Sequence, residues 1–349
     1  MLTSLVLPLL ALTSAAQEAR AASARTTLTT GMPAPTLAVE SWIKGAPVAR
    51  FEPGKLYVIE FWATWCPPCI ASMPHLAELQ NEYGDDGLTI IGLTSNDPRN
   101  PLEKVREMVA AKGDALNYTI AWDSGRTTYA AYMDAAGRKG IPCSFVVDQK
   151  GKIAYIGHPM FLDEPLGELV DGTWDAARDP AQLEQDSEVF FGFYASARSN
   201  PKDTLAKLTD FEKAHPKLHA LTDPLRLQLT LAAGEPAAAE AVAAKLLERG
   251  MATKDVELLL QIAGVCGDPN AKAPPPVLDL ALRAAQGASE ISGGKDMNAL
   301  ALLARVHAAR GDFAAAVTAQ TQAIQAAPEK KRASLMKTLE EYQAKSAGQ

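Results

Sequence analysis

The chain has 349 residues, of which 47% are hydrophobic and 21% are charged, and it carries a net charge of −7. This length exceeds one average domain and predicts two or three, and the composition is that of a folded, soluble protein rather than a disordered one. An acidic chain lacks the basic face that a general nucleic-acid binder needs, so no nucleic-acid partner is expected.

The N-terminus has the pattern of a secretory signal. Leu2–Ala16 contains no charged residue, and Ser14-Ala15-Ala16 offers small residues for cleavage, so residues 1–16 are predicted to be a signal peptide. The protein is then exported, to the periplasm or the medium. The alternative is an uncleaved N-terminus that anchors the chain in the membrane. No stable membrane span is expected after processing, because no later stretch is long and apolar enough.

Residues 17–30 are small and polar and are predicted to be a linker. From residue 31 to about 175, short apolar β-rich runs alternate with helical patterns and close with a hairpin. This order predicts an α/β domain with a central mixed β-sheet flanked by helices. The predicted strands are Leu56–Phe61, Leu88–Leu93, Asn117–Trp122, Ser144–Val147 and Lys152–Ile156; the predicted helices run from the cysteine motif to about Tyr83, from Leu102 to Ala111 and from Thr127 to Ala136.

Residues 180–349 carry no strand signal and are predicted to form an all-α domain. The stretches 225–250 and 298–328 each read as a helix, a glycine-containing turn and a second helix. The second stretch resembles a tetratricopeptide repeat, so a TPR-like array of helical hairpins is predicted. Such arrays bind protein partners in their grooves. The competing interpretation is a passive helical layer or a dimer surface.

Two of the four cysteines stand at an informative spacing. Cys66 and Cys69 are separated by two residues at a predicted strand-to-helix junction. The start of the helix favours a thiolate at the first position. Cys66 is therefore predicted to be the exposed, attacking thiol and Cys69 the resolving one.

Other uses of this pair fit less well. A structural zinc site needs two further ligands, and the five histidines are scattered. A c-type haem site needs histidine after the second cysteine, where Ile70 stands. A purely structural disulfide stays open. We therefore expect no metal and no organic cofactor, only the redox-active disulfide itself.

The surrounding motifs resemble the TlpA/ResA-like branch of the thioredoxin superfamily. The resemblance covers residues 31–172 and implies a thioredoxin-like fold and thiol–disulfide exchange with protein substrates. It rests on the segments Gly31–Pro35, Glu60–Cys69, Met73–Leu76, Gly140–Pro142, Phe145–Asp148 and Gly151–Ile153.

The resemblance also implies roles for single residues. Pro142 should be cis, face the cysteine pair and present the backbone of Ile141 to an extended substrate. Glu60 should be a buried acid that takes the proton of Cys69, and Trp65 a hydrophobic platform beside Cys66. The alternatives are a turn proline, a glutamate at the sheet edge and a packed aromatic ring.

Pro67 and Pro68 lack N–H groups, so two donors that could stabilise the Cys66 thiolate are absent. A weakly stabilised thiolate makes a less oxidising couple, which predicts a reductase. With Trp65 and Ile141, the two prolines are expected to contact the substrate.

Cys143 follows Pro142 directly, where relatives more often carry threonine. It is either a third thiol that modulates Cys66 or a small, half-buried strand residue. Cys266 is expected in the helical core, and a Cys143–Cys266 bridge stays open.

Together these features predict a thiol–disulfide oxidoreductase of the protein-disulfide reductase type. Its electrons would come from another thiol protein. The alternative is a helical-repeat adaptor with a redox-sensing thioredoxin-like module, and a peroxide-reducing variant of the fold is a third interpretation.

Overall fold

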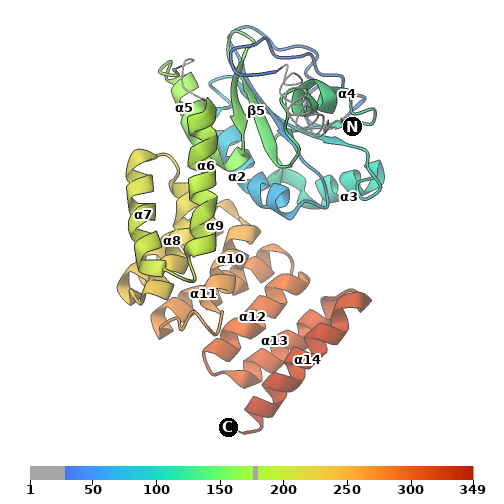
Figure 1. Cartoon of the computed structure of the whole chain (residues 1–349). Coiled ribbons are helices and arrows are strands. Elements are labelled where there is room, and N and C mark those ends of the chain that lie inside the picture. Colours follow the sequence, from blue (N-terminus) through green and yellow to red (C-terminus); the bar gives the residue numbers. More distant parts are fainter. Residues whose placement is uncertain (1–27, 176–179, 349) are drawn as a thin grey trace, which may run out of the picture. The chain divides into compact units, whose positions relative to one another are not determined.

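The computed structural model describes residues 28–175 and 180–348. The chain divides into two compact units, and the boundary between Gln185 and Asp186 falls inside helix α6 (Pro180–Ser196). Figure 1 follows the chain through both units. The predicted signal peptide, residues 1–16, and residues 17–27 of the predicted linker lie outside the described residues.

The first unit contains one six-stranded mixed sheet with the order β1-β4-β3-β2-β5-β6. Strands β2, β3 and β4 are parallel, β5 is antiparallel to β2, and the edge strands β1 and β6 are antiparallel to their neighbours. The predicted mixed sheet is confirmed, and one strand, β1, was not predicted. The strands are β1 (Ser41–Lys44), β2 (Leu56–Phe61), β3 (Leu88–Ser95), β4 (Thr119–Asp123), β5 (Cys143–Val147) and β6 (Ile153–Gly157).

Helices cover both faces of this sheet (Figure 1). Helix α2 packs against β3 on one face, and the residues that follow α4 pack into the core on the other. The predicted helix over 127–136 is a single α-helical turn that continues as a π-helical turn. The helical segments of this unit are α2 (Pro67–Tyr83), α3 (Leu102–Lys112), α4 (Thr127–Tyr129), the π-helix η2 (Ala130–Asp134), α5 (Asp163–Val170), and the short 3₁₀ turns η1 (Gly113–Ala115) and η3 (Pro159–Phe161).

Strand β2 is buried along its whole length and leads directly into the cysteine motif. Side chains alternate between the faces of a strand. Tyr57, Ile59 and Phe61 belong to the core cluster that contains η2, so Glu60 points to the opposite face, which α2 covers. The strand therefore places one ionisable side chain between the sheet and the helix of the cysteine pair.

The last residues of the predicted linker belong to the folded unit. Leu28 is buried, and its N–H donates to the Ala135 carbonyl oxygen at 3.1 Å. The N–H of Gly31 donates to Ile153 O at 2.7 Å. An apolar side chain at 28 and these hydrogen bonds attach the segment to the sheet, so the last three linker residues are part of the fold.

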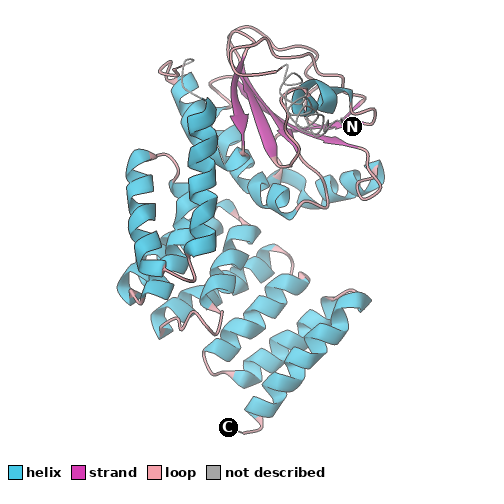
Figure 2. Ribbon diagram, viewed as in Figure 1, coloured by secondary structure: helices cyan, strands magenta, loops and turns pink. Residues whose placement is uncertain are grey.

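The described part of the second unit contains helices and no strand, as Figure 2 shows. Its core is rich in alanine, which lets neighbouring helices approach closely, and it contains Cys266. No described helix is both long and apolar enough to cross a membrane. The helices are α6, α7 (Pro201–Ala214), α8 (His219–Ala233), α9 (Pro236–Thr253), α10 (Val256–Cys266), α11 (Pro275–Ile291), α12 (Met297–Ala309), α13 (Phe313–Ala326) and α14 (Glu329–Ser346).

Candidate active site: the Cys66–Cys69 disulfide

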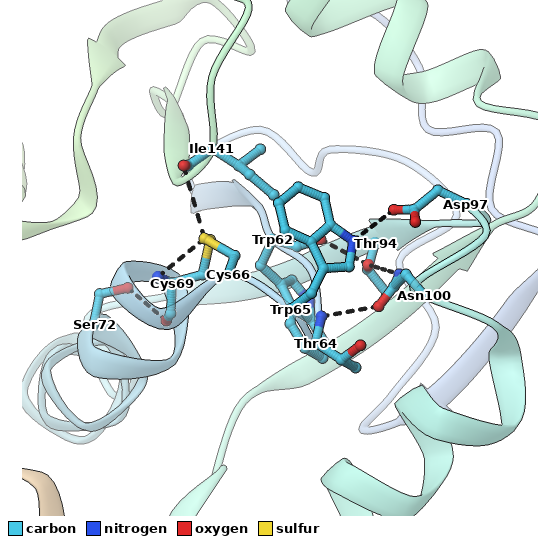
Figure 3. The surroundings of a disulfide bond; sticks show 10 residues. All are labelled: Trp62, Thr64, Trp65, Cys66, Cys69, Ser72, Thr94, Asp97, Asn100 and Ile141. Carbon is cyan, nitrogen blue, oxygen red and sulfur yellow. Dashed lines mark hydrogen bonds between the residues drawn. A yellow bond between two sulfur atoms is a disulfide. The ribbon is translucent and has the colours of Figure 1, made fainter. Parts of the chain in front are cut away.

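Cys66 and Cys69 form a disulfide at the N-terminus of α2, with their Cα atoms 5.3 Å apart (Figure 3). Cys66 is the N-cap residue, and its Sγ accepts a hydrogen bond from the Cys69 N–H at 3.3 Å. Pro67 and Pro68 occupy the first two helical positions and have no N–H to donate. Cys69 is thus the first residue of the helix that can offer a backbone donor to Cys66 Sγ.

The loop that leads into β5, the strand paired with β2, covers the disulfide. The Ile141–Pro142 peptide bond is cis, as the resemblance predicted. The carbonyl oxygen of Ile141 lies 3.7 Å from Cys66 Sγ and points toward it (Figure 3). In the reduced protein, the Cys66 thiol can donate to this oxygen.

The expected exposure of Cys66 is wrong for the disulfide form. Cys66 is 3% exposed and Cys69 is 1% exposed. Both sulfur atoms are buried because the Ile141 backbone approaches them on one side and the first turn of α2 encloses them on the other. Pro67 and Pro68 are exposed, and Ile141 and Pro142 are half-buried, so the accessible surface at the site belongs to these four residues and Trp65.

A buried asparagine fixes the loop before the cysteines. Asn100 is completely buried, and its Oδ1 accepts a hydrogen bond from the Thr64 N–H at 2.8 Å. Its Nδ2 donates to Thr94 Oγ1 at 2.9 Å and to Ser95 O at 2.8 Å. Thr94 in turn donates to the Trp62 carbonyl oxygen at 2.7 Å. These bonds join the end of β3 to the loop that carries Cys66, and Figure 3 draws those among Thr64, Thr94, Asn100 and Trp62.

Trp65 is held in place from two directions. Its Nε1 donates to Asp97 Oδ2 at 2.7 Å, and the guanidinium of Arg99 lies 3.8 Å from the ring centroid. A cation over an indole face is a favourable contact. The half-buried ring is therefore a rigid wall beside the disulfide rather than a freely rotating side chain.

Glu60 is buried on the α2 face of the sheet, so the interpretation as a glutamate at the sheet edge is wrong. Its Oε2 accepts a hydrogen bond from Ser144 Oγ. Its Oε1 and the nearby Trp62 Nε1 have no hydrogen-bond partner among the described residues. Burial raises the pKa of Glu60 to about 8, and the bond from Ser144 opposes that rise.

Space next to Glu60 comes from Gly92, its register partner on β3. A Cβ at this position would lie 2.9 Å from the Ile120 side chain and 3.2 Å from Trp62 Nε1. Any larger residue would crowd the Ile120 side chain and the indole N–H of Trp62. The glycine therefore keeps room around the one buried acid of β2.

The remaining cysteines take no part in the disulfide. Cys143 is 5% exposed in β5 and belongs to the core on the face opposite Glu60. Cys266 is buried in the helical unit, where burial raises its pKa to about 12. Neither is disulfide-bonded, so the Cys143–Cys266 bridge that the sequence left open is not formed. Within the described residues, no group of three or more His, Cys, Asp or Glu is arranged to hold a metal ion.

The fold and the site together define the class of protein: a thioredoxin fold with a Cys-X-X-Cys disulfide at a helix N-terminus and a cis-proline loop over it. The Redoxin family profile matches residues 30–165. Protein FixW of Rhizobium leguminosarum is 30% identical over 154 residues, which are 43% of this chain and 70% of FixW.

The thiol-disulfide oxidoreductase ResA of Halalkalibacterium halodurans is 29% identical over 118 residues, which are 34% of this chain and 62% of that protein. A solved structure, described as a putative thiol:disulfide interchange protein DsbE from Chlorobium tepidum, is 22% identical and covers 41% of this chain and 99% of its own, with a TM-score of 0.33. The chain belongs to the TlpA/ResA-like family of thiol–disulfide oxidoreductases in the thioredoxin superfamily.

These matches concern the first unit. The chain spans less than two thirds of the ResA relative, and FixW and ResA each match less than half of this chain. The substrate of the whole protein and the role of the helical unit do not follow from these matches, and both are proposed below.

Proposed function

We propose that this protein is a reductase of protein disulfides in an exported compartment, with Cys66 as the nucleophile and Cys69 as the resolving thiol. The observation that carries the proposal is the Cys66–Cys69 disulfide under the cis Ile141–Pro142 loop. A helix N-terminus favours the thiolate of Cys66 in the reduced protein. The hydrophobic leader Leu2–Ala16 supports export.

The reaction consumes one dithiol and one substrate disulfide. The Cys66 thiolate attacks one substrate sulfur, the substrate S–S bond breaks, and the other substrate sulfur leaves as a thiolate that takes up a proton. Cys69 then attacks Cys66 Sγ, releases the second substrate thiol and closes the Cys66–Cys69 bond. The substrate gains two electrons, and a second thiol protein must return two electrons to this chain.

Glu60 is proposed to accept the proton of Cys69 during resolution. It lies on the face of the sheet that α2 covers, and its Oε1 has no partner among the described residues. Only the ionised carboxylate can act as a base, and its pKa is about 8. Resolution of a preformed mixed disulfide should therefore accelerate as the pH rises through about 8, and Glu60→Gln should flatten this profile. A profile unchanged by the substitution would contradict this role.

Trapping experiments test which cysteine is the nucleophile and which is the resolving thiol. Cys69→Ser should accumulate a mixed disulfide with a substrate protein through Cys66, detected by non-reducing electrophoresis and mass spectrometry. Cys66→Ser should form none. Cys143→Ser and Cys266→Ser are matched controls that should turn over like the wild type. Trapping through Cys143 instead would assign that residue the modulating role and contradict the scheme.

The direction of electron flow is tested by the reduction potential of the pair. Because Pro67 and Pro68 offer no N–H to the Cys66 sulfur, we expect a reducing couple, at about −250 mV or lower. A value near about −120 mV would make the protein an oxidant of folding proteins.

The helical unit is proposed to select the protein partner of the redox unit. This leaves an adaptor as the competing function, in which the helices do the main work and the cysteine pair only senses redox state. A Cys66→Ser, Cys69→Ser double variant separates the two. Loss of biological activity supports the reductase, whereas full activity supports the adaptor.

A further inference from the structure

A pocket of about 300 Å³ opens next to the disulfide, between Trp65 and Ile141. Its walls also include the end of β3, the region of α4 and the loop that precedes Pro142. Because the Ile141 carbonyl lies 3.7 Å from Cys66 Sγ, a substrate sulfur that reaches Cys66 lies near the pocket mouth. At the small end of ligand-site volumes, this space suits one side chain rather than a whole cofactor.

The charge available in the pocket is positive. Arg126 and Lys139 line it, both exposed, and neither has an acidic partner among the described residues. Asp97 also lines the pocket, but its two carboxylate oxygens accept hydrogen bonds from Trp65 Nε1 and from the Arg99 N–H, each at 2.7 Å. Two cations stand against this one carboxylate, so the charged side chains of the lining sum to one net positive charge, and the Asp97 oxygens already have donors.

Arg126 is directed into this position by its backbone. It has φ +56°, an uncommon conformation for a residue with a Cβ, and its guanidinium lies 3.7 Å from the centroid of the Tyr129 ring. The Asp123 carboxylate holds the turn by accepting hydrogen bonds from the N–H groups of Thr127 and Thr128. The guanidinium of this exposed residue therefore lies over Tyr129, which is part of the pocket wall.

A buried hydroxyl provides a separate indication of a ligand. Ser95 lines the pocket and is 9% exposed, and its Oγ has no hydrogen-bond partner among the described residues. A buried hydroxyl without a partner is unfavourable. A polar group of a bound molecule would provide the missing hydrogen bond.

We propose that this pocket binds the carboxylate of an aspartate or glutamate that lies beside the reacting cysteine of a substrate polypeptide. This rests on the disulfide exchange proposed above and specifies its substrate. Arg126 and Lys139 pair with the carboxylate, Ser95 donates a hydrogen bond, and Trp65 and Tyr129 contact the methylene groups. The pocket thereby selects substrates by sequence, whereas the cysteine pair alone would react with any accessible disulfide.

The test uses peptides whose cysteine is activated as a mixed disulfide with 2-thiopyridine, an uncharged and chromogenic leaving group. Glutamate, glutamine or lysine is placed before or after the cysteine. Attack by the reduced full-length protein releases thiopyridone, which stopped-flow absorbance follows. We expect a glutamate peptide to react about three- to tenfold faster than its glutamine counterpart, with a preference that declines as salt is added.

The Arg126→Gln, Lys139→Gln double variant should lose this preference, so that it reacts with the glutamate and glutamine peptides at equal rates. Arg106→Gln, Lys150→Gln is the matched control, because it removes the same charge from exposed positions outside the pocket, and it should keep the preference. Equal rates for glutamate and glutamine peptides, or a preference that survives in the pocket variant, would overturn the proposal while leaving the exchange reaction intact.

Two further outcomes of this experiment separate failure of the proposed function from failure of the pocket assignment. If the reduced protein releases no thiopyridone from any peptide, the proposed function itself fails. If glutathione disulfide reacts faster than every glutamate peptide and depends on the same two cations, the pocket serves a small carboxylate-bearing thiol, and the polypeptide assignment is wrong.

Discussion

Glu60 shows how one buried residue couples the stability of this protein to pH. Its pKa of about 8 lies above the value of 4.5 of an unperturbed glutamate, because the folded protein disfavours the charged carboxylate. The folded state is therefore more stable when the Glu60 carboxyl group is neutral. Its contribution to stability is complete below pH 4.5 and is lost as the pH rises through 8.

Glu60→Gln should remove this dependence, because glutamine is neutral at every pH. Relative to the wild type, the free energy of unfolding of the variant should rise by about 3 kcal/mol between pH 4.5 and pH 7. Urea unfolding of the oxidised proteins at several pH values measures the difference. Parallel pH curves for the two proteins would show that Glu60 ionises normally in the fold.

His158 gives a pH dependence of stability opposite to that of Glu60. It caps η3, where its Nδ1 accepts a hydrogen bond from the Met160 N–H at 3.3 Å. Burial lowers its pKa to about 4, from the ordinary value of 6.5. The neutral imidazole therefore contributes stability that is complete above pH 6.5 and is lost as the pH falls through 4.

His158→Asn should keep an acceptor for the Met160 N–H but remove the titration. Between pH 7 and pH 4.5 the wild type should lose about 2 kcal/mol more unfolding free energy than the variant. Urea unfolding at the two pH values tests this. Met336→Ala, at an exposed position of the helical unit, changes no titrating group and is the control that should follow the wild type. If the wild type and His158→Asn lose the same unfolding free energy between pH 7 and pH 4.5, the expectation is contradicted.

At the scale of elements, the start of α2 sets the chemistry of the disulfide. The first two helical positions are prolines, so the donors usually available at a helix N-terminus are reduced to the Cys69 N–H near Cys66 Sγ. Pro68→Ala adds one N–H at the second position without lengthening the side chain. A hydrogen bond to a thiolate stabilises the reduced form and makes the couple more oxidising.

We expect the Pro68→Ala potential to lie about 30 mV above that of the wild type. Equilibration in thiol buffers with thiol trapping and mass spectrometry measures it. Pro74→Ala, in the interior of the same helix, is the matched control, because it adds an N–H far from Cys66. An unchanged potential in Pro68→Ala, or an equal shift in both variants, would remove the role of the helix-start prolines.

The elements that the sequence predicted well are those with long, uniform patterns. Leu56–Phe61 is a strand with the predicted bounds because it is apolar apart from Glu60 and buried on both faces. Strand β1 has only four residues, all half-buried, and its place in the sheet comes from pairing with β4, which no local pattern encodes. The π-helical turn after α4 likewise depends on packing of Tyr132 and Met133 in the core.

The residues of the site also divide into those that a local pattern reveals and those that depend on distant contacts. Cys66, Cys69, Glu60 and Pro142 were recognisable because they belong to local motifs. Asp97, Asn100 and Arg126 were missed, because their partners lie far away in the chain: Asn100 meets Thr64 36 positions earlier. One signal was available, the polar run 96–100 directly after a buried strand, at the edge where parallel strands present functional loops.

At the scale of the whole molecule, each unit has its own hydrophobic core. In the first, Ile59 is completely buried among the residues of the sheet and η2. In the second, Leu259 is completely buried among alanine-rich helices. Separate cores predict separate unfolding transitions, because a cavity destabilises mainly the core in which it lies.

Leu259→Ala should therefore lower one calorimetric transition of the intact chain by roughly 5 to 10 °C, from a loss of about 2–5 kcal/mol, and leave the other in place. Ile59→Ala should do the reverse. Met336→Ala, at a 51% exposed position of α14, should shift neither. If Leu259→Ala leaves thiopyridone release at the wild-type rate while its own transition falls, disulfide exchange belongs to the first unit alone. If both transitions move together in either core variant, the chain unfolds as one cooperative body, and the helical unit must then be regarded as part of the structure that supports the active site.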